Sequence, residues 1–383
     1  VSDTAPAKCI ERSCIAGLSE ALDRVHRGVP LSKSSGGSEH GGWAERLRTP
    51  LAAEVKLAAD PASAQAEIRR IIETALPVVL RQAASEWQPN IAWTVKHLSA
   101  EREGGNDLVD VTIVPDRNEF EVREDKMIRP PHSTVRLADL VQHLHRKVEL
   151  RDGLALYTRQ ATLWSMPRLL QDVTIPVSWM ERLRIHDLNV WLGDGLFRNT
   201  LHNDPQDNFL CLIHGTKHVL LFPPHTGKWL YYNLRADWQA KYHPKRGMGR
   251  HYDTGIVSNN TGGINFAALD LGAYPDVVLA LAEHTYAEIH AGDCLYLPRG
   301  HHHHVFSEAD PDLGFHLGVN LWFSREATLA RYDETASADA LGVTFGRLAN
   351  EDRQAPTLHQ VRSVLDSCSA DLTTQSQATH DEL

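Results

Sequence analysis

The segment LHNDPQDNFLCLIHGTKHVLLFPP, residues 201–224, contains the pattern that decides the fold of this chain. Two apolar runs stand on either side of a turn at Gly215 and Thr216, which predicts two short β-strands. His202 and Asp204 lie two positions apart just before the first run, and side chains at i and i+2 of an extended segment project to the same face. The segment therefore predicts a strand that presents an imidazole and a carboxylate together.

The strand pattern continues through residues 186–324, with Gly or Pro at most strand ends. Short strands at this spacing are typical of a barrel or jelly roll and not of βαβ units. Residues 1–64 combine helical spacing with the flexible linker LSKSSGGSEHGG, and residues 65–185 mix short strands with helical pieces. Residues 325–383 predict a helical segment and a polar, disordered tail. The predicted fold class is mainly β, with α and α+β additions around one barrel.

Two segments lead to more specific predictions. Residues 65–85 include IRRIIETALPVVLRQA, whose apolar residues have helical spacing and predict a helix. Residues 225–287 are long for a loop between strands, and we expect them to cover the mouth of a site. A surface excursion without a role in the site is the alternative.

Composition excludes several classes of protein. The formal net charge of −10 argues against a broad electrostatic footprint for nucleic acid. No stretch of the sequence approaches the length of an apolar membrane span, and residues 1–13 lack an apolar signal segment, so no membrane partner is expected. The five cysteines are scattered without a CxxC pair, which fits a reducing compartment. We therefore expect an intracellular protein, cytoplasmic or nuclear, in which Cys211 and Cys294 are small core residues.

A second segment, GDCLYLPRGHHHHVF at residues 292–306, supplies further imidazoles. A Gly-Asp turn leads into an apolar strand, a proline break and then four consecutive histidines. Two imidazoles and one carboxylate on one triangular face leave three positions open on Fe(II). Spacing alone does not choose the second imidazole, because the alternate strand positions His301 and His303 can face the same way.

Taken in order, these motifs resemble the JmjC family, cupin-like oxygenases that use Fe(II), 2-oxoglutarate and O2. The matching motifs are WLGDG, LHND, GTKHVLLFPP, GDCLYLP, HHV and VNLWF, and the resemblance spans roughly residues 70–335. It implies a double-stranded β-helix, the jelly roll of the cupin and JmjC proteins. It also implies a dioxygenase that hydroxylates a protein side chain, with lysine as the implied target, and that releases succinate and CO2.

The resemblance assigns roles to individual residues. His202, Asp204 and His303 match the iron ligands, His303 being the first histidine of a pair followed by Val. His301 remains the alternative third ligand. Lys217 matches the basic residue that binds the distal carboxylate of 2-oxoglutarate, where an ammonium would compensate a buried anion. The other residues matched to the cosubstrate site are Tyr157, Asn199, Asn208, Asn320 and Trp322.

Two positions depart from the family pattern. His301 stands where the family usually has an aromatic residue, and Asn199 stands where it often has Thr. These departures affect the expected substrate and cosubstrate pockets more than the iron site. Four assignments have structural alternatives: Lys217 as a solvated hairpin residue, Trp322 as a core residue, and Tyr157 and Asn320 as residues without a role in cosubstrate binding.

Three classes of function remain open. A protein hydroxylase is favoured, and the resemblance implies a GTPase as its protein substrate and allows a homodimer. A JmjC oxygenase acting on methylated lysine or on a tRNA base is the second class. A catalytically silent metal-binding cupin, or a peptidase-like relative, is the third. The chain's net negative charge suits a basic peptide.

Overall fold

The computed structural model describes most of residues 51–325. Two predicted regions lie outside the described residues: the N-terminal helix with its linker, and the C-terminal helical segment with its tail. No helix in the described part of the chain is both long and apolar enough to cross a membrane. The internal segments outside the description are 115–120, 124–125, 148–153, 174–182, 196, 234, 244–246, 259–260, 265, 267–268 and 270–271.

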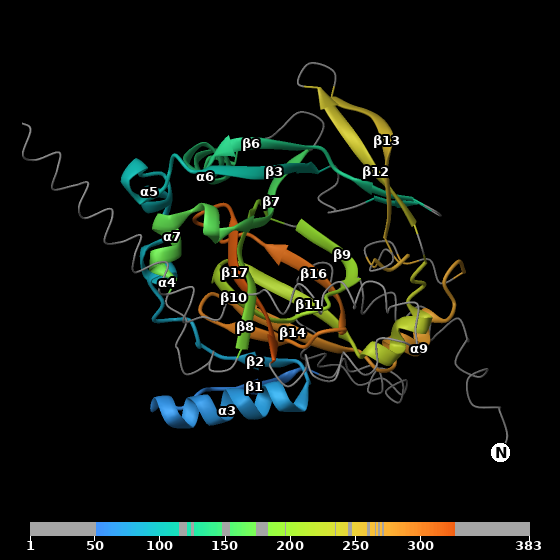
Figure 1. Ribbon diagram of the computed structural model, residues 1–383, viewed down its shortest axis with the longest axis horizontal. Coiled ribbons are helices and arrows are strands. Elements are labelled where there is room, and N and C mark those ends of the chain that lie inside the picture. The colour runs from blue at the N-terminus through green and yellow to red at the C-terminus, as the bar shows by residue number, and fades with distance from the viewer. Residues whose placement is uncertain are drawn as a thin grey trace, which may run out of the picture.

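Two β-sheets with separate strand orders form the centre of the molecule, consistent with the predicted jelly roll (Figure 1). The smaller has four described strands in the order β14-β11-β16-β9: β14 (Thr285–His290), β11 (Thr216–Phe222), β16 (His302–Glu308) and β9 (Phe197–Asn203). The larger has nine described strands in the order β1-β2-β15-β10-β17-β8-β7-β3-β6: β1 (Ala53–Val55), β2 (Val78–Leu80), β15 (Cys294–Leu297), β10 (Asp207–His214), β17 (His316–Arg325), β8 (Leu183–Gly193), β7 (Ala155–Thr162), β3 (Leu108–Val114) and β6 (His132–Arg136).

Strand β10 explains why the apolar run FLCLI, residues 209–213, is continuous. Phe209 and Ile213 belong to the core beneath the helices, whereas Leu210 and Leu212 belong to the core that also includes residues of β11 and β16. A strand buried on both faces needs apolar residues at every position. The continuous apolar run of β10 therefore indicates that the larger sheet is buried on both faces at this strand.

The turn at Gly215 passes the chain from one sheet to the other, since β10 and β11 pair with different strands. Gly215 has a φ of 85°, which favours glycine, and a Cβ at this position would collide with the carbonyl oxygen of Glu308. The positive φ and the close approach of the Glu308 carbonyl oxygen both favour glycine at position 215.

Replacing Gly215 by alanine is expected to lower the free energy of unfolding by roughly 2–5 kcal/mol, combining left-handed backbone strain with overpacking. Gly255 is a matched control, because its φ is 74° but an added Cβ would meet nothing within 4 Å. Gly255→Ala should therefore show the backbone cost alone. Urea unfolding of both variants measures the difference, and equal losses would contradict the close approach at Gly215.

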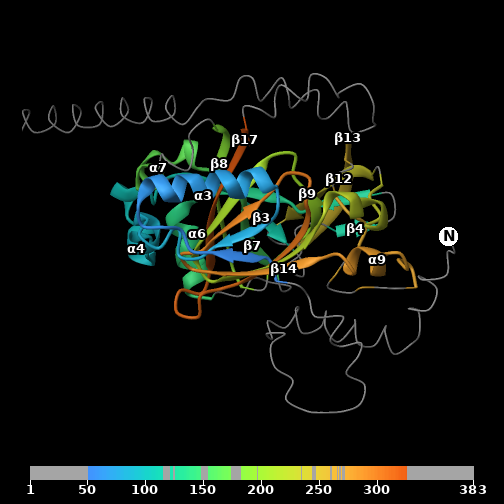
Figure 2. The same ribbon diagram turned by 90° about the horizontal axis from the view of Figure 1, so that it is seen from below.

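Helices cover the outer face of the larger sheet. Helix α3 starts after Asp60, whose carboxylate accepts a hydrogen bond from the Ser63 N–H at 2.9 Å, and it packs Ile68 and Ile71 into the core. Figure 2 shows α3, α4, α6 and α7 in the half of the molecule away from β13 and α9, and Figure 1 shows α3 apart from the other three, beside β1 and β2. The elements are α3 (Pro61–Thr74), α4 (Gln88–Ala92), α5 (Val95–Leu98), η2 (Glu101–Glu103), α6 (Leu137–His145), η5 (Leu163–Ser165) and α7 (Pro167–Asp172).

The predicted helix over residues 65–85 is wrong in its second half. Helix α3 ends at Thr74, Ala75 is left-handed with a φ of 50°, and Pro77 has no N–H with which to continue a helix. Val78–Leu80 instead forms β2, which pairs with β15. Three apolar residues fit either a helix face or a buried strand, and the proline is the signal that separates the two.

The segment 225–287 is folded and is not a simple loop. Its two long strands join β5 and β4 in a third sheet of described strands in the order β13-β12-β5-β4, which Figure 1 shows on the side opposite α4, α5 and α7. The elements are η6 (Pro224–Trp229), β12 (Arg235–His243), β13 (Gly247–Ser258) and α9 (Val277–Leu281), together with β4 (Glu121–Arg123) and β5 (Lys126–Arg129) from earlier in the chain.

Cys211 and Cys294 form a disulfide, which corrects the prediction of two free core cysteines. The residues are direct partners in the antiparallel pairing of β10 with β15, and their Cα atoms are 4.0 Å apart. They are separated by 83 positions in the sequence. Strand register, and not spacing along the chain, brings two thiols together, so scattered cysteines do not exclude a disulfide.

Candidate metal centre

A cavity of about 110 Å³ lies among the strands of the jelly roll. Its walls include apolar side chains from both main sheets, such as Leu210 and Val219. All nine residues predicted for the site line this cavity, although they come from six strands and the segment after β9. They are Tyr157, Asn199, His202, Asp204, Asn208, Lys217, His303, Asn320 and Trp322.

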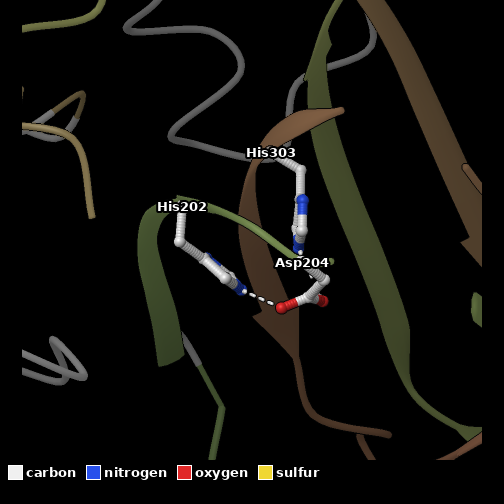
Figure 3. Close-up of side chains that lie close together, drawn as sticks. All are labelled: His202, Asp204 and His303. Atoms are coloured by element: carbon white, nitrogen blue, oxygen red, sulfur yellow. Dashed lines mark ion pairs between the residues drawn. The ribbon is translucent and has the colours of Figure 1, made fainter. Parts of the chain in front are cut away.

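His202, Asp204 and His303 form a cluster whose potential ligand atoms all lie within 4.8 Å of one another. His202 and His303 are direct partners in the antiparallel pairing of β9 with β16, which brings together residues 101 positions apart. The Nε2 atoms of His202 and His303 lie 4.0 and 3.8 Å from the two carboxylate oxygens of Asp204. Figure 3 shows the three side chains converging on one point.

The tautomers of the two imidazoles follow from their backbone contacts. Nδ1 of His202 lies 2.6 Å from the carbonyl oxygen of Thr200, and Nδ1 of His303 lies 3.0 Å from that of His301. A carbonyl oxygen only accepts, so each Nδ1 donates its hydrogen and each Nε2 keeps its lone pair toward Asp204. Two neutral imidazoles and one carboxylate are a donor set that fits a divalent transition metal.

The four consecutive histidines, residues 301–304, have different surroundings in the folded chain. Among the described residues, His303 is the member of this run that joins the cluster with His202 and Asp204. His301 is buried outside the cluster, and burial lowers the pKa of its imidazole to about 4. The side chain of His304 lies against Phe266, with ring centroids 5.7 Å apart.

Lys217 is buried and not solvated, which excludes the hairpin alternative. Its side chain is 2% exposed, and its ammonium donates to the Ser307 hydroxyl at 2.7 Å. Burial lowers the pKa of Lys217 from 10.5 to about 7. A hydroxyl does not supply countercharge, so an anion bound in the cavity would stabilise the charged form of this side chain.

Tyr157 and Asn199 lie in the same cavity as Lys217. The Tyr157 hydroxyl donates to the Asn199 side-chain oxygen at 3.4 Å, and the Tyr157 ring stacks on Phe197 with centroids 3.6 Å apart. The phenol is fully buried. This packing holds a hydroxyl donor in a cavity that also contains a buried ammonium.

Three strands are tied together by amide and indole groups at the cavity wall. The Trp191 indole N–H donates to the side-chain oxygen of Asn320 at 2.7 Å, and the side-chain NH2 of Asn320 donates to the side-chain oxygen of Asn208 at 3.3 Å. Trp322 also lines the cavity. Its indole N–H is buried without a hydrogen-bond partner in the described structure.

Besides aliphatic wall residues such as Leu210 and Val219, four further residues that sequence analysis did not assign to the site line the cavity: Met127, Arg129, Trp191 and Thr261. Trp191 lies in the WLGDG motif, which was a usable signal. No sequence motif pointed to the other three, because they reach the cavity through the third sheet and the 225–287 segment. Arg129 on β5 donates to Asp237 on β12 at 2.7 and 2.9 Å, and Asp237 is 1% exposed. Part of the 225–287 segment thus contributes to the cavity wall, directly through Thr261.

Comparison with known proteins agrees with this architecture. The profile of the cupin-like domain family matches residues 63–329. The human protein named bifunctional peptidase and (3S)-lysyl hydroxylase JMJD7 is 26% identical over 276 residues, which cover 70% of this chain and 84% of that protein. JmjC domain-containing protein E of Dictyostelium discoideum is 22% identical over 67% of this chain and 80% of its own length. Lysine-specific demethylase 8 of Danio rerio is 26% identical over 45% of this chain and 37% of its own length.

Proposed function

The chain belongs to the family of cupin-like domain proteins, and from that premise we propose that it is an Fe(II)- and 2-oxoglutarate-dependent dioxygenase that hydroxylates a protein side chain. One observation carries the proposal: the His202, Asp204 and His303 cluster and the buried Lys217 line the same cavity. A metal-binding triad alone would suit many cupins. A buried cation beside it suits a cosubstrate that is a dianion.

Each part of the cosubstrate has a group that fits it. The triad would hold Fe(II) and leave positions open for the keto acid end of 2-oxoglutarate. Lys217 would bind the distal carboxylate, and the Tyr157 hydroxyl would donate to it. Bound together, Fe(II), 2-oxoglutarate and O2 would supply an oxidation in which one oxygen atom enters a substrate C–H bond and the other enters succinate, with release of CO2.

The chain's own residues would prepare the site for this chemistry. The carbonyls of Thr200 and His301 fix the ligand tautomers, so that both imidazoles present a lone pair to the metal. The hydrogen bonds from Trp191 to Asn320 and from Asn320 to Asn208 hold three strands of the wall in register. Apolar side chains in the wall, such as Leu210 and Val219, would lower the local dielectric constant and so strengthen the attraction between Lys217 and a bound carboxylate.

Lysine is the proposed target side chain. The human relative is named a lysyl hydroxylase, and two indole rings, Trp191 and Trp322, line the cavity with centroids 6.5 Å apart in an edge-on arrangement. Indole faces favour cationic side chains. The name of the Danio rerio relative, lysine-specific demethylase 8, favours a second candidate, removal of a methyl group from a methylated lysine at the same site. A GTPase substrate and a homodimer are proposals that rest on the resemblance alone.

The test incubates the purified chain with Fe(II), 2-oxoglutarate, ¹⁸O2 and a cell-extract proteome, and follows succinate and peptide masses. Hydroxylation adds one labelled oxygen atom to a peptide and releases one succinate. Demethylation releases succinate and removes a methyl group, whereas a peptidase cuts the peptide without succinate. A silent cupin produces none of these changes, and that result would refute the proposal.

A further inference from the structure

The residues that alternate with the proposed metal ligands form a second cluster. Asn203, the last residue of β9, lies between His202 and Asp204 in the sequence, and His302 precedes His303 on β16. Asn203 and His302 are direct register partners, and neither lines the cavity. Because successive side chains of a strand point to opposite faces, the second cluster lies on the reverse side of the strands that hold the ligands.

A tyrosine from the 225–287 segment contacts this second cluster. The Tyr232 hydroxyl lies 2.9 Å from Nδ1 of His302, and the two rings pack with centroids 4.8 Å apart. The Asn203 amide nitrogen lies 3.4 Å from the same Nδ1. The Tyr232 side chain, which lies outside the cavity, therefore packs at the pair formed by His302 and Asn203, the sequence neighbours of the proposed ligands.

The direction of these hydrogen bonds follows from the other nitrogen of His302. Its Nε2 lies 3.1 Å from the carbonyl oxygen of Pro224, so Nε2 carries the hydrogen and donates it. Nδ1 is then an acceptor, and the Tyr232 hydroxyl donates to it. Gly227 permits this arrangement, because a Cβ at residue 227 would lie 2.7 Å from Nε2 of His302.

The backbone around Tyr232 is attached to the ligand strand as well. Tyr232 forms an isolated β-bridge with Gly262, and Thr261 forms one with His202 itself. The Gly262 N–H donates to the Leu201 carbonyl at 2.8 Å. The buried guanidinium of Arg235 donates to the Thr261 carbonyl at 2.9 Å and closes this part of the segment on itself.

We propose that Tyr232 is a positioning residue of the metal centre, whose hydroxyl acts through His302 and Asn203 to hold β9 and β16 at the separation that metal binding requires. This inference rests on the metal centre of the proposed function. Tyr232 does not line the cavity, so it would act on the ligands and not on the metal or substrate. The segment expected only to cover the mouth would then also support the metal site from behind.

Tyr232→Phe removes the hydroxyl and keeps the ring, and Tyr231→Phe is its matched control. Tyr231 lies in the same segment, and its hydroxyl accepts a hydrogen bond from the Asp276 N–H at 3.1 Å, apart from the ligand strands. Mn(II) alone is titrated into each metal-free protein and followed by electron paramagnetic resonance. Tyr232→Phe is expected to weaken Mn(II) binding about tenfold, the effect of losing an outer hydrogen bond at a metal site. Tyr231→Phe should bind as the wild type does.

A double-mutant cycle with His302→Leu tests the route of the effect. If the hydroxyl acts through His302, the double variant binds Mn(II) no more weakly than the weaker single variant. The melting temperatures of the metal-free proteins separate positioning from stability, since a purely structural role would lower them without changing affinity measured below the transition. Wild-type affinity in Tyr232→Phe, or additive effects in the cycle, would overturn the inference. Failure of the wild type to bind Mn(II) would instead overturn the metal centre of the proposed function.

Discussion

Asp204→Ala is expected to abolish succinate formation. Asp204 is the carboxylate of the cluster, and its two oxygens face the Nε2 atoms of His202 and His303. Without it, two neutral imidazoles remain to hold a divalent cation, with no charge to offset the cation's desolvation. The affinity for Mn(II) should therefore fall by more than the roughly 10- to 100-fold that the loss of an outer partner costs a metal site.

The measurement pairs succinate release with an Mn(II) titration of the metal-free protein. Asp312→Ala is the control, because Asp312 is exposed and its described hydrogen bond uses only its backbone N–H. The control should keep wild-type rates and affinity. Metal-dependent turnover by Asp204→Ala at the wild-type rate would refute the assignment of this residue as a ligand.

Lys217→Met is expected to change cosubstrate binding and stability in opposite directions. Removing one partner of a buried charge pair costs about 2 kcal/mol or more, so 2-oxoglutarate should bind at least about 30-fold more weakly. The metal-free protein should become more stable, because burial lowers the pKa of Lys217 from 10.5 to about 7. At about 1.4 kcal/mol per pKa unit, the penalty on the buried ammonium is roughly 4 to 5 kcal/mol, of which the lost Ser307 hydrogen bond offsets about 1 kcal/mol.

The sign of the pH dependence follows from proton binding. Between about pH 7 and pH 10.5 the unfolded chain holds a proton on this lysine that the folded chain has released, so wild-type stability rises with pH in that window. Below pH 7 Lys217 is protonated in both the folded and the unfolded chain, so the folded state bears the full cost of burying the ammonium. The advantage of Lys217→Met should therefore be largest at pH 6 and smaller at pH 9.

Urea unfolding of the metal-free proteins at these two pH values measures the effect, and calorimetric titration with 2-oxoglutarate in the presence of Mn(II) measures binding. Lys228→Met is the control, since Lys228 is exposed and lies over the Trp229 ring. A Lys217→Met protein that binds 2-oxoglutarate normally would remove this residue from the cosubstrate site.

The strands could be predicted because a buried strand requires a run of apolar residues, which is visible in the local sequence. Runs such as NFLCLI and KHVLLF correspond to β10 and β11, and both have side chains in cores on the inside of the jelly roll. The placement of His202 two residues before Asp204 was likewise a local feature. The helix over 65–85 failed where local spacing is ambiguous, at the three apolar residues that became β2.

The features that sequence analysis missed all depend on contacts between distant segments. Cys211 meets Cys294 through the register of β10 with β15. Arg129 reaches the cavity on a strand that pairs with β12, far along the chain. Tyr232 reaches His302 through a segment whose length predicted a cover for the mouth and nothing more specific.

A mainly β fold, with an imidazole near the end of one strand and a carboxylate two residues later, could be predicted from the amino-acid sequence, because the alternation of side chains along an extended segment depends only on neighbouring residues. The three-dimensional structure was needed to show that His303 joins them, that Lys217 is buried against the Ser307 hydroxyl, and that Cys211 and Cys294 pair. These outcomes depend on which strands become neighbours and in which register, and that is set by the packing of the whole core.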